Sequence, residues 1–232
     1  RGEQVLGGGE VLLPGEITLE PSEAYESPWL YGAFGEGMDA VARRFHAHLR
    51  ARDDAPGPDR PVTLNVWEAV YFRHDADELI ALADTAAEIG IERFVVDDGW
   101  FGRRDTDKAG LGDWTVNPAK FPRGLKPLID RVHGLGMSFG LWVEPEMVNP
   151  DSDLYRAHPD WILNFTGRDH SLGRNQMVLN LAREDVKAHV FEVLDRLLAE
   201  NDIQFLKWDY NRNWSEPGWP QMAPDEQQKV YV

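Results

Sequence analysis

The chain contains no cysteine among its 232 residues, and this absence excludes disulfide bonds and thiolate metal ligands. It also lacks an apolar run approaching the roughly 20 residues that span a bilayer. Residues 1–15 have neither the charged start nor the apolar core of a signal peptide, so we expect a soluble protein of the cytoplasm. The first residue is arginine rather than methionine, so we expect the chain to be a piece of a longer protein.

Several common functional motifs are missing as well. There is no GxSxG, no phosphate-binding loop and no zinc-binding helix motif, and the seven histidines are scattered without metal-site spacing. Basic residues number 24 against 40 acidic ones, and the net charge of −16 argues against nucleic acid or an anionic membrane as partner. We therefore expect no cofactor and a neutral or cationic small molecule as ligand.

Composition divides the chain into three parts. Residues 1–36 are rich in glycine, proline and glutamate and show strand and turn signals. Apolar residues recur at helical spacing over 38–52 and the proline-rich run DDAPGPDRP follows, so residues 37–59 are interpreted as a helix and a linker. A third domain begins near Arg60 and covers residues 60–232.

In this third part, predicted strands alternate with predicted helices. Strands are expected at 62–72, 93–97, 138–143, 177–181 and 205–209, and helices at 76–89, 125–135, near 154 and at 184–201. This order is typical of an α/β protein with a parallel sheet covered on both faces. Polar residues follow the strands at their carboxyl ends and no glycine-rich turn follows the first strand, which favours a (β/α) barrel over a doubly wound sheet. Because a full barrel has eight strands in roughly 250 residues, we expect a truncated one.

The run IQFLKWDYNRNW, at residues 203–214, carries the densest set of reactive groups. In a strand, side chains alternate between faces, so Lys207, Asp209 and Asn211 share one face while Trp208 and Tyr210 point the other way. An ammonium beside Asp209 favours its ionised form, which suits a nucleophile in covalent glycosyl transfer. The alternative is an ordinary Lys–Asp pair at the surface of a strand end.

Other strand ends carry further candidates. Asp97 and Asp98 follow an apolar strand and could hold sugar hydroxyls or a divalent metal, or could simply form a turn or a helix cap. Glu144 and Glu146 could act as acid or base, or could pair with arginines such as Arg174 or Arg183 and only orient the site. Tryptophans near the strand ends could pack on a sugar ring or belong to the core: Trp67, Trp100, Trp142 and Trp208.

A series of ordered sequence blocks runs through the chain from about Tyr25 onward: SPWLYGAFGEG (27–37), VVDDGWFGRRD (95–105), GDWTVNPAKFPRGL (112–125), GLWVEPEMVNPDSDLY (140–155), HPDWIL (158–163), GRNQMVLNLAR (173–183) and KWDYNR (207–212). In this order the blocks resemble those of the family 36 α-galactosidases. The resemblance implies the first part of a (β/α)8 barrel at 60–232, preceded by the end of a β-sandwich domain at 1–36 and a linker helix. It also implies a retaining enzyme that cleaves terminal α-galactosyl residues from raffinose-type oligosaccharides.

Carried over position by position, the resemblance assigns roles to particular residues. Asp209 is the implied nucleophile that forms a galactosyl-aspartate intermediate, and the implied sugar-binding residues are Trp67, Asp97, Asp98, Trp142, Arg174 and Lys207. The acid/base aspartate is expected on a later strand beyond Val232, so we expect residues 1–232 alone to be inactive. The chain departs from the family pattern at Tyr210, which should point away from the pocket, and at Asn180, which could change a hydrogen bond.

Three other functions stay open at this point. One is a galactosyltransferase of the raffinose-synthase type, and another is a noncatalytic sugar-binding module. The third is a metal-dependent barrel enzyme with Asp97, Glu144 and Asp209 as oxygen ligands. In each sugar-related case the expected partner is an α-galactoside, and the complete protein could form a homo-oligomer.

Overall fold

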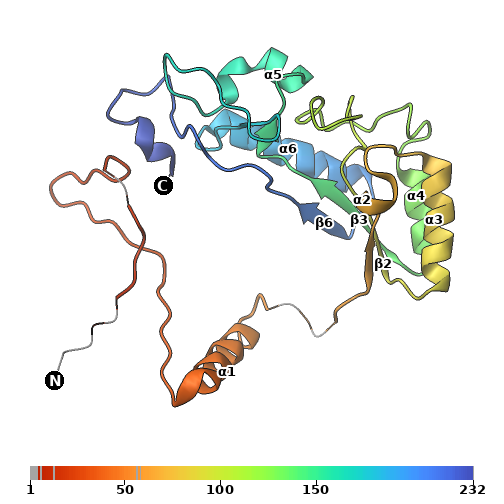
Figure 1. Cartoon of the computed structure of the whole chain (residues 1–232), viewed down its shortest axis with the longest axis horizontal. Coiled ribbons are helices and arrows are strands. Elements are labelled where there is room, and N and C mark those ends of the chain that lie inside the picture. The colour runs from red at the N-terminus through yellow and green to blue at the C-terminus, as the bar shows by residue number, and fades with distance from the viewer. Residues whose placement is uncertain (1–4, 6, 13, 56, 58, 232) are drawn as a thin grey trace. The chain divides into compact units, whose positions relative to one another are not determined.

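The structure is a computed structural model, which describes residues 5, 7–12, 14–55, 57 and 59–231. The chain forms two compact units, residues 1–60 and residues 61–231. In the described part of the first unit, the regular element is helix α1, Gly37–Arg50 (Figure 1). This confirms the predicted helix, whereas the β-sandwich origin of residues 1–36 stays a prediction.

The second unit is built on a parallel sheet, as the sequence predicted. Its strands are β1 (Thr63–Asn65), β2 (Arg93–Val96), β3 (Ser138–Val143) and β6 (Phe205–Trp208), in the order β1-β2-β3-β6. All three pairings are parallel. The carboxyl ends of the four strands therefore meet at one edge of the sheet.

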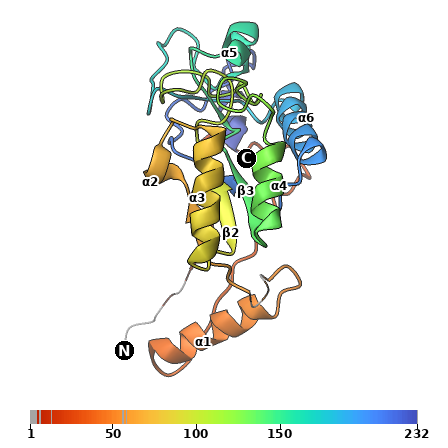
Figure 2. The ribbon, with the colours of Figure 1, turned by 90° about the vertical axis from the view of Figure 1, so that its right-hand side faces the viewer.

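Helices α3 (Ala76–Glu88), α4 (Lys126–Gly134) and α6 (Glu184–Glu200) connect these strands and confirm three predicted helices. Figures 1 and 2 show α3 and α4 side by side along the sheet. The Asp75 side chain caps α3 by accepting hydrogen bonds from the N–H groups of Asp77 and Glu78 at 2.9 and 3.0 Å. Among the described residues, no helix combines the length and the apolar character needed to cross a membrane.

Both α3 and α4 end in the same way before the next strand begins. Gly90 and Gly136 adopt φ of 85° and 82°, which a residue without Cβ tolerates. The next residues, Ile91 and Met137, donate to carbonyls five positions earlier at 3.0 and 3.1 Å, as in a Schellman motif. Each chain reversal leads directly into a strand, so the αβ connections are short.

Two predicted strands differ from the structure. The expected strand at 62–72 ends at Asn65, and helix α2 (Trp67–Val70) follows because the Asn65 side chain accepts from the Trp67 N–H at 2.8 Å and starts a turn. The expected strand at 177–181 is β5 (Met177–Val178), which pairs antiparallel with β4 (Met147–Val148) instead of joining the parallel sheet. Its place beside β3 is taken by β6. The β4–β5 pair and the short helix α5 (Asp153–Ala157) lie in the connection between β3 and β6.

Candidate active site

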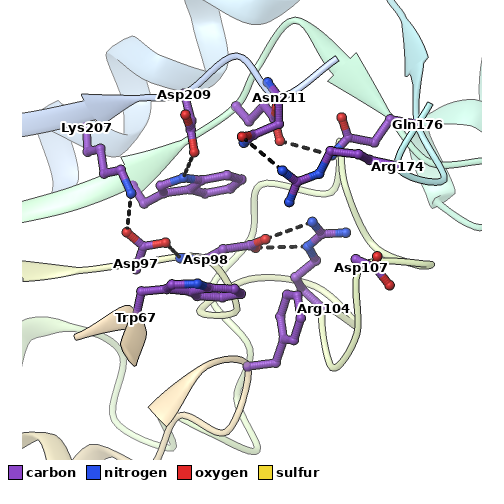
Figure 3. A pocket seen from close by; sticks show the side chains of 13 residues that line it. Trp67, Asp97, Asp98, Arg104, Asp107, Arg174, Gln176, Lys207, Asp209 and Asn211 are labelled. Carbon is purple, nitrogen blue, oxygen red and sulfur yellow. Dashed lines mark hydrogen bonds and ion pairs between the residues drawn. The ribbon is translucent and has the colours of Figure 1, made fainter. Parts of the chain in front are cut away.

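A pocket of about 270 Å³ lies where the strands end, and every residue to which the family resemblance assigns a catalytic or sugar-binding role lines it, whereas the further candidates Glu146, Trp100 and Trp208 do not (Figure 3). The lining consists of Trp67, Phe72, Asp97, Asp98, Arg104, Asp107, Trp142, Glu144, Arg174, Gln176, Lys207, Asp209 and Asn211. Parallel pairing explains this convergence, because it brings residues from β2, β3 and β6 to one edge. The register pairs Trp142 with Lys207 and so puts the two side chains next to each other.

The alternation expected for β6 is confirmed. Lys207, Asp209 and Asn211 line the pocket, whereas Trp208 and Tyr210 are 48% and 46% exposed. Pairing with β3 continues past the strand, since the Asp209 N–H donates to the Val143 carbonyl at 2.8 Å. The Asp209 carboxylate is thus held at the strand end with little freedom to turn away.

The surroundings of Asp209 favour its ionised form. Its Oδ2 accepts a hydrogen bond from the Trp142 indole N–H at 3.0 Å, and its Oδ1 accepts from the Tyr210 N–H at 3.1 Å. Partial burial raises the pKa of Asp209, but the hydrogen bonds from Trp142 and Asn211 and the charge of Lys207 outweigh burial and lower it overall. The carboxylate is therefore charged and available for nucleophilic attack.

Lys207 makes its ion pair with a different carboxylate from the one the surface-pair alternative assumed. Its Nζ lies 2.7 Å from Oδ2 of Asp97, which also accepts from the Asn65 amide. Asp97 is only 3% exposed, and its Oδ1 accepts from the Asp98 N–H at 2.8 Å. The Lys–Asp interaction thus spans β2 and β6 across the pocket.

Asp98 forms a buried pair with Arg104. Both guanidinium contacts are short, with Nε at 2.9 Å from Oδ1 and Nη2 at 2.7 Å from Oδ2. Burial raises the pKa of Asp98, and the Arg104 charge opposes that rise. Asp98 lies in a turn after β2, as one alternative expected, but both carboxylates also bind cations that line the pocket, so the turn alone does not describe this pair.

Arg174 reaches the pocket from a turn with unusual backbone angles. Arg174 and Asn175 have φ of 53° and 60°, and the Gln176 N–H donates to the Gly173 carbonyl at 3.0 Å, as in a type I′ turn. The Arg174 guanidinium donates to Oδ1 of Asn211 at 3.3 Å. The turn therefore aims a cation at the segment that carries Asp209.

Glu144 lines the pocket and is completely buried, with hydrogen bonds from the Asn211 N–H at 2.6 Å and the Gln176 amide at 3.1 Å. Burial and the charge of Asp209 raise the pKa of Glu144, although the two hydrogen bonds oppose the rise. Glu146 accepts from the Trp208 indole at 2.9 Å instead.

The alternative in which these glutamates pair with Arg174 or Arg183 is wrong. Arg183 pairs with Asp160 and Asp185, both at 2.7 Å. Arg174 donates to the amide oxygen of Asn211. Asn180, the second departure from the family pattern, is buried outside the pocket lining, where its Oδ1 accepts from the Ala182 N–H at 3.2 Å.

Several pocket residues were not predicted: Phe72, Arg104, Asp107 and Gln176. Arg104 is the most consequential, because it neutralises Asp98 and lies over the Phe72 ring at 5.3 Å from its centroid. The run of two arginines after the aspartate pair was a usable signal, but sequence alone does not tell which of Arg103 and Arg104 turns inward.

The donor set does not favour a metal centre. The carboxylates of Asp97 and Asp209 are bound by Lys207, Asn65 and Trp142. Within the part of the chain that the structure describes, no group of three or more His, Asp or Glu side chains is placed to hold a metal ion.

Comparison with known proteins gives one family over nearly the whole chain. The melibiase family model matches residues 24–232. An α-galactosidase from Escherichia coli is 42% identical over 221 residues, which are 94% of this chain and 31% of that protein.

Comparison with solved structures points to the same family. The GH36 α-galactosidase AgaB from Geobacillus stearothermophilus matches with a TM-score of 0.81 and 46% identity, over 84% of this chain and 27% of that chain. Forms of AgaA from the same organism, in crystals with stachyose and with raffinose, match with a TM-score of 0.80 and 44% identity, over 84% of this chain and 28% of theirs. The chain spans about a third of the length of the curated relatives it matches. It belongs to the melibiase family, the GH36 α-galactosidases.

Proposed function

We propose that this chain forms the nucleophile side of the active site in an α-galactosidase that acts on raffinose-type oligosaccharides. The observation that carries the proposal is the ionised Asp209, held by the Trp142 N–H in a small pocket of polar groups. The parallel sheet β1-β2-β3-β6 would be one arc of a (β/α)8 barrel, whose remaining strands would close the pocket. Relatives crystallised with raffinose and stachyose support this choice of substrate.

The pocket suits one terminal sugar. Its volume of about 270 Å³ lies just below the range of about 300–1,000 Å³ for drug-sized ligands, so a single ring fits better than an oligosaccharide. Asp97 and Asp98 can accept hydrogen bonds from sugar hydroxyls, while Lys207 and Arg174 can donate to hydroxyl oxygens. The rings of Trp67 and Trp142 line the pocket and can offer apolar contact to a sugar ring. Charges of both signs facing one small cavity suit a neutral ligand with many hydroxyl groups.

The chemistry follows from these positions. The Asp209 carboxylate attacks the anomeric carbon, an ester bond forms, and the bond from that carbon to the departing oxygen breaks. A general acid gives a proton to the departing oxygen. It then takes a proton from water, which attacks the anomeric carbon, releases galactose and restores the Asp209 carboxylate. The Trp142 and Asn211 hydrogen bonds keep the leaving carboxylate stable in this second step.

The general acid is assigned by family resemblance to an aspartate after Val232. In the pocket itself, the carboxylates of Asp97 and Asp98 are paired with Lys207 and Arg104. Glu144 has a raised pKa, so an E144Q variant of the complete protein tests whether it supplies the proton.

The first test is Asp209→Ala in the complete protein, with raffinose as substrate and released galactose as readout. We expect more than a thousandfold loss of rate, because removal of a nucleophile typically costs larger factors. Asp202→Ala is the matched control, since Asp202 precedes the strand that leads to Asp209 but is exposed, and its carboxylate contacts Gln204 and His133. Labelling of Asp209 by a mechanism-based galactosyl inhibitor, read by mass spectrometry, identifies the covalent step. A D209A rate within a thousandfold of wild type would contradict the assignment.

A further inference from the structure

Asn149 lies directly after β4 and is completely buried, outside the pocket lining. Its amide oxygen accepts from Nη1 of Arg104 and from the Leu111 N–H, both at 2.9 Å. Its amide nitrogen donates to the carbonyls of Asp107 at 3.1 Å and Asn175 at 2.7 Å. These four bonds use the two donor and two acceptor positions of the amide. The opposite orientation would place the NH₂ group against two N–H donors, so the partners fix the amide in one orientation.

The four partners come from two segments that both supply pocket residues. The first is the 103–111 loop, which carries Arg104 and Asp107, and the second is the 173–176 turn, which carries Arg174. The side chain of Asn175 also donates to Oδ2 of Asp107 at 3.2 Å, so the two segments are tied to each other as well. Asn149 is thus the residue that both pocket-lining segments share.

Each segment needs outside support to hold its side chain in place. Arg104 sets the position of Asp98 through a buried pair, and its Nη1 donates to the Ala109 carbonyl at 3.2 Å as well as to Asn149. Loss of the Asn149 acceptor would leave one buried donor of Arg104 unsatisfied, which weakens the hold on this side chain. The turn has positive φ at both Arg174 and Asn175, a conformation that is unfavourable for residues other than glycine. Its Asn175 carbonyl bonds the Asn149 amide at 2.7 Å, which helps hold the turn in that conformation.

We propose that Asn149 is a positioning residue that fixes the distance between Asp98 and Arg174, and thereby the affinity of the pocket for the sugar. The proposal rests on the proposed function. In the described part of the chain, Asn149 makes no hydrogen bond to Asp209 or to β6, the strand that leads into it. A change at Asn149 therefore alters substrate binding more than the covalent step.

The test is Asn149→Asp in the complete protein, assayed for hydrolysis of raffinose. The substitution keeps the shape and the acceptor for Arg104 and Leu111, but removes both N–H donors. We expect KM to rise about 10- to 100-fold with kcat changed much less, because a sugar contact made equally in ground and transition state affects KM alone. Should the buried carboxylate prevent folding, N149A adds no charge and carries the same expectation.

Ser152→Ala is the matched control. The Ser152 hydroxyl is buried, donates to the Asn149 carbonyl at 2.8 Å and accepts from the Tyr155 N–H at 3.0 Å, yet touches neither pocket-lining segment. The S152A substitution should lower the melting temperature of the protein and leave KM within about twofold of the wild-type value. An equal rise of KM in S152A, or an unchanged KM in N149D, would overturn the proposal.

A second readout does not depend on catalysis. Amide hydrogen exchange in peptides covering 103–111 and 173–176 should become faster in N149D and stay as in wild type in S152A. If the wild-type protein fails to hydrolyse α-galactosides, the proposed function fails, while the exchange experiment still decides whether Asn149 holds both segments. Unchanged exchange in both peptides of N149D would refute the positioning role.

Discussion

Replacing Trp142 by phenylalanine separates the electrostatic role of its indole N–H from its role as a ring. The N–H donates to Oδ2 of Asp209 at 3.0 Å, and the side chain is 1% exposed, so phenylalanine keeps most of the packing. Burial raises the pKa of Asp209, while the hydrogen bonds from Trp142 and Asn211 and the Lys207 charge lower it overall. Removal of one of these donors must therefore raise the pKa of Asp209.

The size of the effect follows from the strength of one hydrogen bond to a charged group. Such bonds contribute about 1.5–3 kcal/mol, and the partial exposure of Asp209 points to the low end because solvent screens the charge. At about 1.4 kcal/mol for each unit, the pKa of Asp209 should rise by about one unit. The nucleophile then takes up its proton at a higher pH than in the wild type.

The assay is the pH dependence of kcat/KM for raffinose hydrolysis by the complete protein, since its acidic limb reports the free enzyme's essential carboxylate. In W142F this limb should move about one unit toward neutral pH. If kcat/KM of W142F also falls by a factor that is the same at every pH, that part of the loss would reflect the contact between the Trp142 ring and the sugar.

Trp208→Phe is the matched control for this measurement. Trp208 is the last residue of β6, directly before Asp209, but it lies outside the pocket lining and donates to Oε1 of Glu146 at 2.9 Å. The pH profile of W208F should therefore match that of the wild type. An unmoved acidic limb in W142F, with the enzyme otherwise active, would show that the indole does not stabilise ionised Asp209.

Two further predictions concern charge in the pocket. Arg104→Met leaves the buried Asp98 without its cation, and breaking such a pair should lower the free energy of unfolding by about 3–5 kcal/mol, measured by guanidinium unfolding with tryptophan fluorescence. Burial already raises the pKa of Asp98, and loss of Arg104 raises it more; the folded state then binds the proton more tightly than the unfolded state. The destabilisation should therefore be smallest below the unfolded pKa of about 3.9 and should grow as pH rises to the folded value, and a pH-independent loss would contradict this. Dialysis against a chelator should leave hydrolysis unchanged, because protein donors already bind Asp97 and Asp209; activity lost to the chelator and restored by Mg²⁺ would support the metal-dependent alternative.

The parts of the fold and the site that could be predicted are those governed by strand and helix period. The strand phase alone placed Lys207, Asp209 and Asn211 on one face, and the structure confirms it. The apolar runs of β2 and β3 located the strand ends that carry Asp97 and Trp142. The failure at residues 66–72 has a local cause, since the Asn65 side chain starts a helical turn where the apolar pattern suggested a longer strand.

The residues that could not be predicted lie on connections. Arg104 and Asp107 come from a loop with no regular period, and their direction depends on hydrogen bonds to Asn149, which lies about 40 residues further along the chain. Arg174 was predicted only from family resemblance, and its position depends on a left-handed turn that no local pattern requires of an arginine. A short stretch of sequence gives no information on such long-range contacts, so the directions of these side chains could not be predicted from it.

The pocket residues therefore form two groups, one held by backbone pairing in strands and the other held by side-chain hydrogen bonds between connections. The groups proposed to take part in the covalent step are on or next to strands, where backbone pairing fixes them: Asp209 bonds Val143 through its own N–H, and Trp142 is within β3. The pocket residues Arg104, Asp107 and Arg174 are instead on the 103–111 loop and the 173–176 turn, where one buried amide connects them. Substitutions of Asp209 and Trp142 should therefore act mainly on kcat, and substitutions in the two connections mainly on KM. Relatives with different substrate preferences can then differ in these connections while keeping the same strand-borne chemistry, because the two groups of residues are supported by separate sets of hydrogen bonds.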